Sequence, residues 1–70
     1  MKIILTNHSK KRMIERNINI QKIKETIELP NYAITKGNKI EAYKKIKEKT
    51  LKVIYIKEDK FIKIITLIWK

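Results

Sequence analysis

The sequence predicts an α+β fold, in which two N-terminal helices pack on one face of a mainly antiparallel sheet of four or five strands. Two observations lead to this class. Apolar residues recur at helical spacing in the first 29 residues, whereas the chain from Tyr32 onward is rich in β-branched and aromatic residues interrupted by short polar turns. Seventy residues are enough for one domain only, so residues 1–70 are expected to form a single folding unit with a small core.

The N-terminal part predicts a strand followed by a helix. Residues 2–6 are apolar and β-branched, which favours a short strand. Thr6 or Asn7 can cap a helix over residues 8–16, on which Met13 and Ile14 form a narrow apolar side. Asn17 is expected to end this helix, because asparagine tolerates the left-handed conformation found at helix C-termini.

A second helix is predicted over residues 20–29. Asn19 can cap its N-terminus, and Pro30 cannot continue it. Ile20, Ile23 and Ile27 follow helical spacing and give the helix one apolar face.

The remainder of the chain predicts four strands, at residues 32–36, 39–46, 51–57 and 60–69. Gly37 and Asn38 form a two-residue turn of the hairpin kind between the first two. The last two strands are apolar on both faces, which is typical of central strands or of a sheet whose second face contacts a partner. Tyr55 lies in such a strand and is expected in the core, whereas Tyr43 alternates with charged residues and is expected to be exposed.

The composition favours a polyanionic partner. Eighteen basic residues against seven acidic ones give a formal net charge of +11, which is typical of proteins that bind nucleic acid. A bias toward lysine and isoleucine, as in AT-rich genomes or heat-adapted proteins, is an alternative source of part of this charge. There is no cysteine and only one histidine, so no metal or other cofactor is expected. The chain has neither a signal-peptide pattern nor an apolar run of about 20 residues, so a cytoplasmic protein without membrane contact is expected.

The run His-Ser-Lys-Lys-Arg-Met-Ile-Glu-Arg, from position 8 to position 16, holds the only histidine and both arginines. On a helix that turns about 100° per residue, His8, Arg12 and Glu15 fall within an arc of about 60°. An imidazole, a guanidinium and a carboxylate on one face are side chains that acid–base chemistry on a phosphate can use. The alternative is a short solvated helix whose charges form only weak pairs.

The spacing His8-x-x-x-Arg12-Met13-x-x-Arg16, followed by Asn17-Ile and a proline after the second helix, resembles a family of small prokaryotic domains of unknown function. The relatives usually have alanine where this chain has Ser9, and glycine where it has Asn17. In size and element order this family is similar to ribonuclease toxins of the RelE and BrnT type.

The resemblance implies a toxin-like, metal-independent endoribonuclease paired with an acidic antitoxin. His8 or Glu15 would be the base that activates a 2′-hydroxyl, with Arg12 and Tyr43 completing the catalytic set. RNA would be held by basic and aromatic side chains, namely Arg16, Lys44, Lys45 and Trp69. The alternative is a basic module that binds nucleic acid or a protein partner without catalysis.

Overall fold

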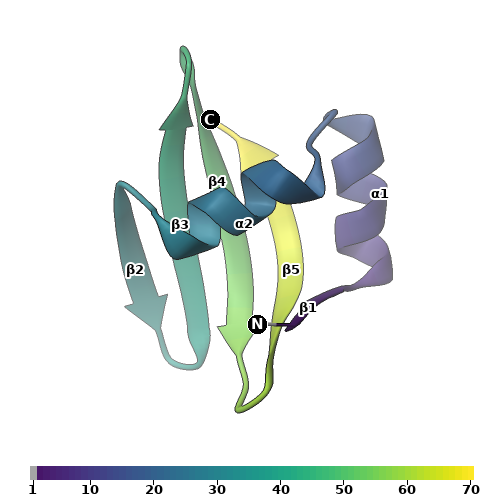
Figure 1. Cartoon of the computed structure of the whole chain (residues 1–70), viewed down its shortest axis with the longest axis vertical. Helices are drawn as coiled ribbons and strands as arrows, with labels where there is room; N and C mark the ends of the chain where they lie inside the picture. Colours follow the sequence, from purple (N-terminus) through teal and green to yellow (C-terminus); the bar gives the residue numbers. More distant parts are fainter. Residues whose placement is uncertain (1) are drawn as a thin grey trace.

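A computed structural model describes residues 2–70 of the chain and contains every element that the sequence predicts. The elements are β1 (Lys2–Leu5), α1 (Asn7–Glu15), α2 (Ile20–Glu28), β2 (Tyr32–Lys36), β3 (Lys39–Ile46), β4 (Lys49–Lys57) and β5 (Phe61–Trp69). The five strands form one sheet in the order β1-β5-β4-β3-β2 (Figure 1). In the described part of the chain no helix is long and apolar enough to cross a membrane.

The sheet is mixed. Hairpins join β2 to β3, β3 to β4 and β4 to β5, so these three pairs are antiparallel. β1 instead lies parallel to the first half of β5, with Ile3 opposite Ile62 and Leu5 opposite Ile64. The sheet predicted as mainly antiparallel is therefore a mixed one, because β1 pairs in parallel. This strand leads into α1 rather than into a hairpin, so its direction is not set by a tight turn.

The sequence predicted both helices on one face of the sheet, but in the structure they do not share a face. α2 crosses the middle of one face, whereas α1 lies beside the edge of β5, farther from the viewer in Figure 1. Ser9 and Met13 point inward from α1, and Ile14 is 84% exposed. The predicted apolar pair of Met13 and Ile14 is therefore only half right. Because Ser9 is small and fully buried, α1 can approach the sheet edge closely.

The core lies between α2 and the sheet. Ile23 and Ile27 of α2 are buried as predicted, but Ile20 is 43% exposed. The buried cluster also contains Ile18, Ala42, Leu51, Val53, Tyr55, Ile62, Ile64 and Leu67. Burial raises the pKa of Tyr55, whose core position is as predicted. Alternate residues of the same strands point to the opposite face, which α2 does not cover.

Asn17 ends α1 as predicted. Its φ angle is +53°, in the left-handed region. The N–H of Ile18 donates to the carbonyl of Met13 at 2.9 Å, and the N–H of Asn17 donates to that of Ile14 at 3.4 Å. These two bonds form a Schellman motif, and the buried Ile18 supplies its apolar contact. The motif turns the chain from the sheet edge toward the face that α2 covers.

We expect Asn17→Ala to lower the free energy of unfolding by about 1 kcal/mol, because alanine lacks the local hydrogen bonding that lets asparagine adopt a positive φ. Asn17→Gly should keep the stability of the parent chain, since glycine has no Cβ to strain this conformation. Urea denaturation of the three proteins measures the difference. An alanine variant as stable as the glycine variant would contradict the assigned backbone conformation.

Candidate functional site

His8 lies in the first turn of α1, at the border of the uncovered sheet face. The Thr6 hydroxyl caps this helix by accepting from the N–H of Ser9 at 3.0 Å. His8 is exposed, and its Nε2 lies 3.2 Å from the Oγ1 of Thr66 on β5. Thr66 is opposite Ile54 in the sheet register, so its side chain belongs to the uncovered face. The imidazole therefore has a fixed neighbour on one nitrogen and remains open to solvent.

Arg12 and Glu15 form an ion pair on the same helix, as their i,i+3 spacing predicts. The hydrogen bond from Arg12 is the largest influence on the Glu15 carboxyl and lowers its pKa, although burial opposes it; the charges of Arg12, Lys11 and Arg16 lower the pKa further. A carboxylate with a lowered pKa is a weak base. Glu15 is therefore better suited to directing the Arg12 guanidinium than to removing a proton.

We call the sheet surface opposite α2 the open face. Its side chains come from alternate positions of four strands and from Lys70, which follows β5, and they include Tyr32, Ile34, Lys36, Lys39, Glu41, Tyr43, Lys45, Thr50, Lys52, Ile54, Ile56, Lys63, Thr66, Ile68 and Lys70. Among these side chains, six are lysine and one is glutamate, so the surface is strongly positive. Three isoleucines between the lysines, at positions 54, 56 and 68, are only partly buried.

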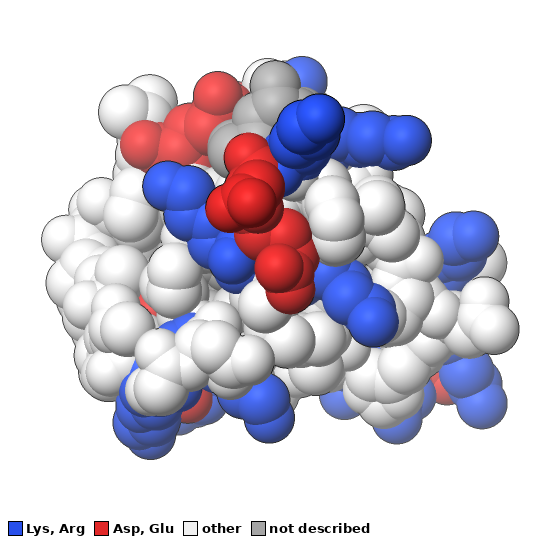
Figure 2. Space-filling model, turned by 90° about the horizontal axis from the view of Figure 1, so that it is seen from below, with Lys and Arg blue, Asp and Glu red and all other residues white. Residues whose placement is uncertain are grey.

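The end of the molecule that carries the β4–β5 turn differs in charge from the open face. Viewed from this end in Figure 2, acidic side chains gather at the centre with basic side chains around them. Glu58 and Asp59 belong to the turn itself, between Lys57 and Lys60. A surface of mixed charge attracts a polyanion less than the open face does.

Tyr43 lies on the open face but is not exposed, contrary to the prediction. Its ring stacks on that of Tyr32, with the centroids 4.5 Å apart, and only 6% of the residue is accessible. The ammonium groups of Lys52 and Lys70 lie 5.5 and 5.9 Å from the ring centroid. Tyr32, which the sequence pattern did not single out, covers Tyr43 and is itself 55% exposed. The sequence could have predicted this contact, because counting residues outward from the turn at Gly37 places Tyr32 opposite Tyr43.

Glu41 is the acidic member of the open face. Burial raises the pKa of its carboxyl, but the hydrogen bond from the Tyr43 hydroxyl (3.2 Å) and the charges of Lys36 and Lys52 outweigh it and lower the pKa below its usual value. The Lys36 and Lys52 ammonium groups lie 3.5 and 3.8 Å from its oxygens. The carboxylate is therefore ionised at neutral pH and holds Tyr43 and the two lysines in place.

The two lysines that were predicted to bind nucleic acid are on opposite sides of the sheet. Lys44 points toward α2 and donates to the Leu29 carbonyl at 2.8 Å, where a cation is favourable because the helix ends there. It therefore contacts the C-terminal end of α2 and does not belong to the open face. Lys45 is exposed and belongs to the open face.

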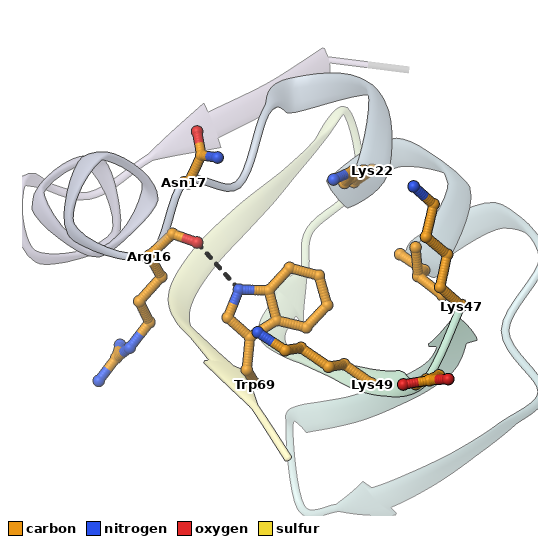
Figure 3. A pocket seen from close by; sticks show the side chains of 8 residues that line it. Arg16, Asn17, Lys22, Lys47, Lys49 and Trp69 are labelled. Carbon is orange, nitrogen blue, oxygen red and sulfur yellow. Dashed lines mark hydrogen bonds between the residues drawn. The ribbon is translucent and has the colours of Figure 1, made fainter.

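Arg16 and Trp69 meet at a pocket of about 630 Å³ on the other side of the molecule, beside α2 (Figure 3). The indole N–H donates to the Arg16 carbonyl at 2.9 Å. The Arg16 guanidinium points away from the ring and donates to the Leu67 carbonyl at 2.7 Å, which ties α1 to β5. Arg16 thus contributes its backbone to the pocket. The remaining lining residues are Asn17, Lys22, Ile46, Lys47, Glu48 and Lys49.

A comparison with protein-family models matches residues 5–69 to one family, described as a domain of unknown function (DUF4258). The match covers nearly the whole chain. The chain belongs to this family. Searches of curated proteins and of solved structures returned no match. The description of the family assigns no chemistry, so a function has to be inferred from the geometry of this member.

In this family member the predicted site residues, apart from Lys44, separate into two regions. His8, Arg12 and Glu15 lie along α1 at the border of the open face, which also carries Tyr43 and Lys45. Tyr43 is two strands from β5, or about 10 Å at the usual strand spacing, so it does not stand beside His8. Arg16 and Trp69 form the separate pocket. Within residues 2–70 no three histidine or acidic side chains are grouped as metal ligands would be.

Proposed function

We propose that this protein is a toxin-like, metal-independent endoribonuclease that binds RNA across the open face and cleaves it beside His8. One observation carries the proposal: an uncovered sheet face with six lysines and an exposed tyrosine is bordered by the only histidine of the chain. The similarity of the α1 motif and of the element order to RelE and BrnT type toxins supports the same activity. Such an enzyme would act in the cytoplasm, where its substrate is found.

Binding would use both charge and stacking. Lys39, Lys45 and Lys63 are exposed and can pair with phosphates, which releases counterions and favours association. The exposed ring of Tyr32 is held rigidly against Tyr43, so it can stack on a base at little cost in side-chain entropy. Lysine contacts with phosphate and aromatic contacts with bases are the usual combination for single-stranded RNA.

Cleavage would begin with removal of the 2′-hydroxyl proton by the neutral His8 imidazole. The 2′-oxygen then attacks the adjacent phosphorus, the bond to the 5′-oxygen breaks, and that oxygen takes up a proton from water. The products are a 2′,3′-cyclic phosphate and a free 5′-hydroxyl. Arg12, directed by Glu15, is placed one helical turn from His8 and can stabilise the charge that develops on the phosphate.

The proposed partner is an acidic antitoxin. The open face combines lysines with partly exposed isoleucines, so an acidic protein with apolar residues would complement it. A protein bound there would also cover the border at which His8 lies. Binding of the antitoxin and of RNA would then exclude each other.

RNA binding without cleavage is the second candidate. Two observations favour it. Tyr43 lies two strands away from β5, so it cannot assist His8. Among the described residues, Thr66 is the only side chain that hydrogen-bonds to His8, so no second catalytic group is in contact with the imidazole. Incubation of the purified protein with single-stranded RNA in EDTA separates the two candidates. Fragments with 2′,3′-cyclic phosphate ends support the endoribonuclease, whereas a retarded but intact RNA supports the second candidate.

We expect RNA affinity to fall steeply with salt, and the lysines of the open face to set the slope. Replacing Lys39 and Lys63 with alanine should reduce the slope of log K against log salt by roughly 0.7 for each phosphate that the protein no longer neutralises. Replacing Lys24 and Lys57, which are exposed elsewhere, removes the same charge and should change the slope less. Equal effects of the two pairs would show that net charge, rather than the open face, controls binding.

A further inference from the structure

The residues that line the pocket beside α2 have no role in the proposed cleavage of RNA. Trp69 lies at its centre, and the ammonium groups of Lys22 and Lys49 are each 5.8 Å from the ring centroid (Figure 3). Lys47 adds a third cation, and Glu48 is the one acidic residue in the lining. α2 begins at Ile20, so the positive end of its dipole adjoins the same region.

From this geometry we infer that the pocket binds a nucleoside monophosphate unit, with the base against the Trp69 ring and the phosphate among the three lysines. The volume of about 630 Å³ is within the range of sites for small organic ligands. The indole N–H is already bound to the Arg16 carbonyl, which fixes the ring and leaves its π-face for stacking. The lysine side chains are flexible, so an entering base can displace one ammonium group from the ring toward the phosphate.

Two features favour a nucleotide over a simpler ligand. An inorganic anion would use the lysines but not the indole, and an apolar ligand would leave three ammonium groups and a carboxylate unmatched. A nucleotide can contact both the lysines and the indole, because it joins an aromatic ring to a phosphate within one small molecule. Glu48 can in addition accept from an exocyclic amino group or a ribose hydroxyl.

This inference extends the proposed RNA binding but does not depend on cleavage. The nucleotide can be free in solution or one unit of an RNA strand whose remaining part lies elsewhere on the protein. The same contacts apply to both sources. They differ in affinity, because additional nucleotides of a strand would reach further lysines.

Trp69 is the only tryptophan of the chain, so its fluorescence reports on this pocket alone. The experiment titrates the full chain with nucleoside 5′-monophosphates, nucleosides, inorganic phosphate and a short 2′-O-methyl RNA, with excitation at a wavelength selective for tryptophan. We expect saturable quenching by the monophosphates, at least tenfold weaker binding of nucleosides, and no saturable quenching by phosphate. Tighter binding of the RNA than of the monophosphates assigns the pocket to a strand, and the reverse assigns it to a free nucleotide.

Replacing Lys22 and Lys49 together with alanine should weaken monophosphate binding by roughly tenfold, since the phosphate would have two fewer ammonium groups to pair with. Replacing Lys57 and Lys60, at the opposite end of β4 and β5, is the matched control and should leave binding unchanged. Absence of saturable quenching by any monophosphate overturns the inference, as does equal weakening by the two pairs. Neither result bears on RNA cleavage, which is read from fragments rather than from Trp69.

Discussion

Replacing His8 with alanine should lower the rate of RNA cleavage by about 10²–10⁴-fold, the usual effect of removing a proton-transfer group. The imidazole is exposed and makes one side-chain hydrogen bond, with Thr66, so its loss should leave the melting temperature nearly unchanged. Arg12→Ala should reduce cleavage as well, because the guanidinium one helical turn from His8 would no longer stabilise the phosphate. Cleavage rates and thermal melting are measured on the same preparations.

Lys10→Ala is the matched control for both variants, since this residue is exposed on α1 and carries a charge. It should cut RNA at the rate of the parent chain. If His8→Ala and Arg12→Ala melt and cut like the parent, the outer side of α1 is only a solvated surface. If both lose their fold, the two residues are structural and the catalytic assignment fails.

Leu67→Ala should have the largest effect on stability. Leu67 is fully buried on β5, within the core cluster, and truncation of a buried leucine typically costs about 2–5 kcal/mol. Small domains have a total stability of roughly 5–15 kcal/mol, so this one change can remove much of it. Urea denaturation measures the loss, and Ile14→Ala, at a residue 84% exposed, should be close to the parent. A Leu67 variant as stable as the Ile14 variant would contradict the assigned core.

Local features of the fold were predictable because they depend on neighbouring residues. The caps at Thr6 and Asn19, the left-handed Asn17 and the hairpin turn at Gly37 each follow from the chemistry of one or two side chains. The strand β4 begins two residues earlier than expected, at Lys49. A polar turn was expected after β3, but it is shorter than expected, and the positive φ of Lys47 (+60°) within it was not predicted.

The position of α1 was not predictable from its apolar pattern. The pattern selected Met13 and Ile14, but the inward side of the helix is formed by Ser9 and Met13, and the cap residue Arg16 bonds to β5 through its guanidinium. Periodicity arguments assume that the buried residues are apolar. Here a small polar residue is buried because its hydroxyl donates to the Thr6 carbonyl at 2.9 Å, and no feature of the sequence indicates this bond.

The candidate site depends on contacts between distant parts of the chain. The bond between Trp69 and the Arg16 carbonyl joins residues 53 positions apart, and the contact between His8 and Thr66 spans 58. Alternation along β3 placed Tyr43 on the correct face, but its burial depends on Tyr32 from the neighbouring strand. Residue types and faces can therefore be inferred from this sequence, whereas their exposure and their partners cannot.

The central claim is that RNA lies on the open face with His8 at its border. The most direct test is a titration of ¹⁵N-labelled protein with a 2′-O-methyl RNA, which cannot be cleaved through the 2′-hydroxyl, followed by amide chemical shifts. We expect the largest changes in β3 and β4, in Tyr32 and in the first turn of α1. Changes confined to the outer surface of α2, or no saturable change at low salt, would contradict the claim.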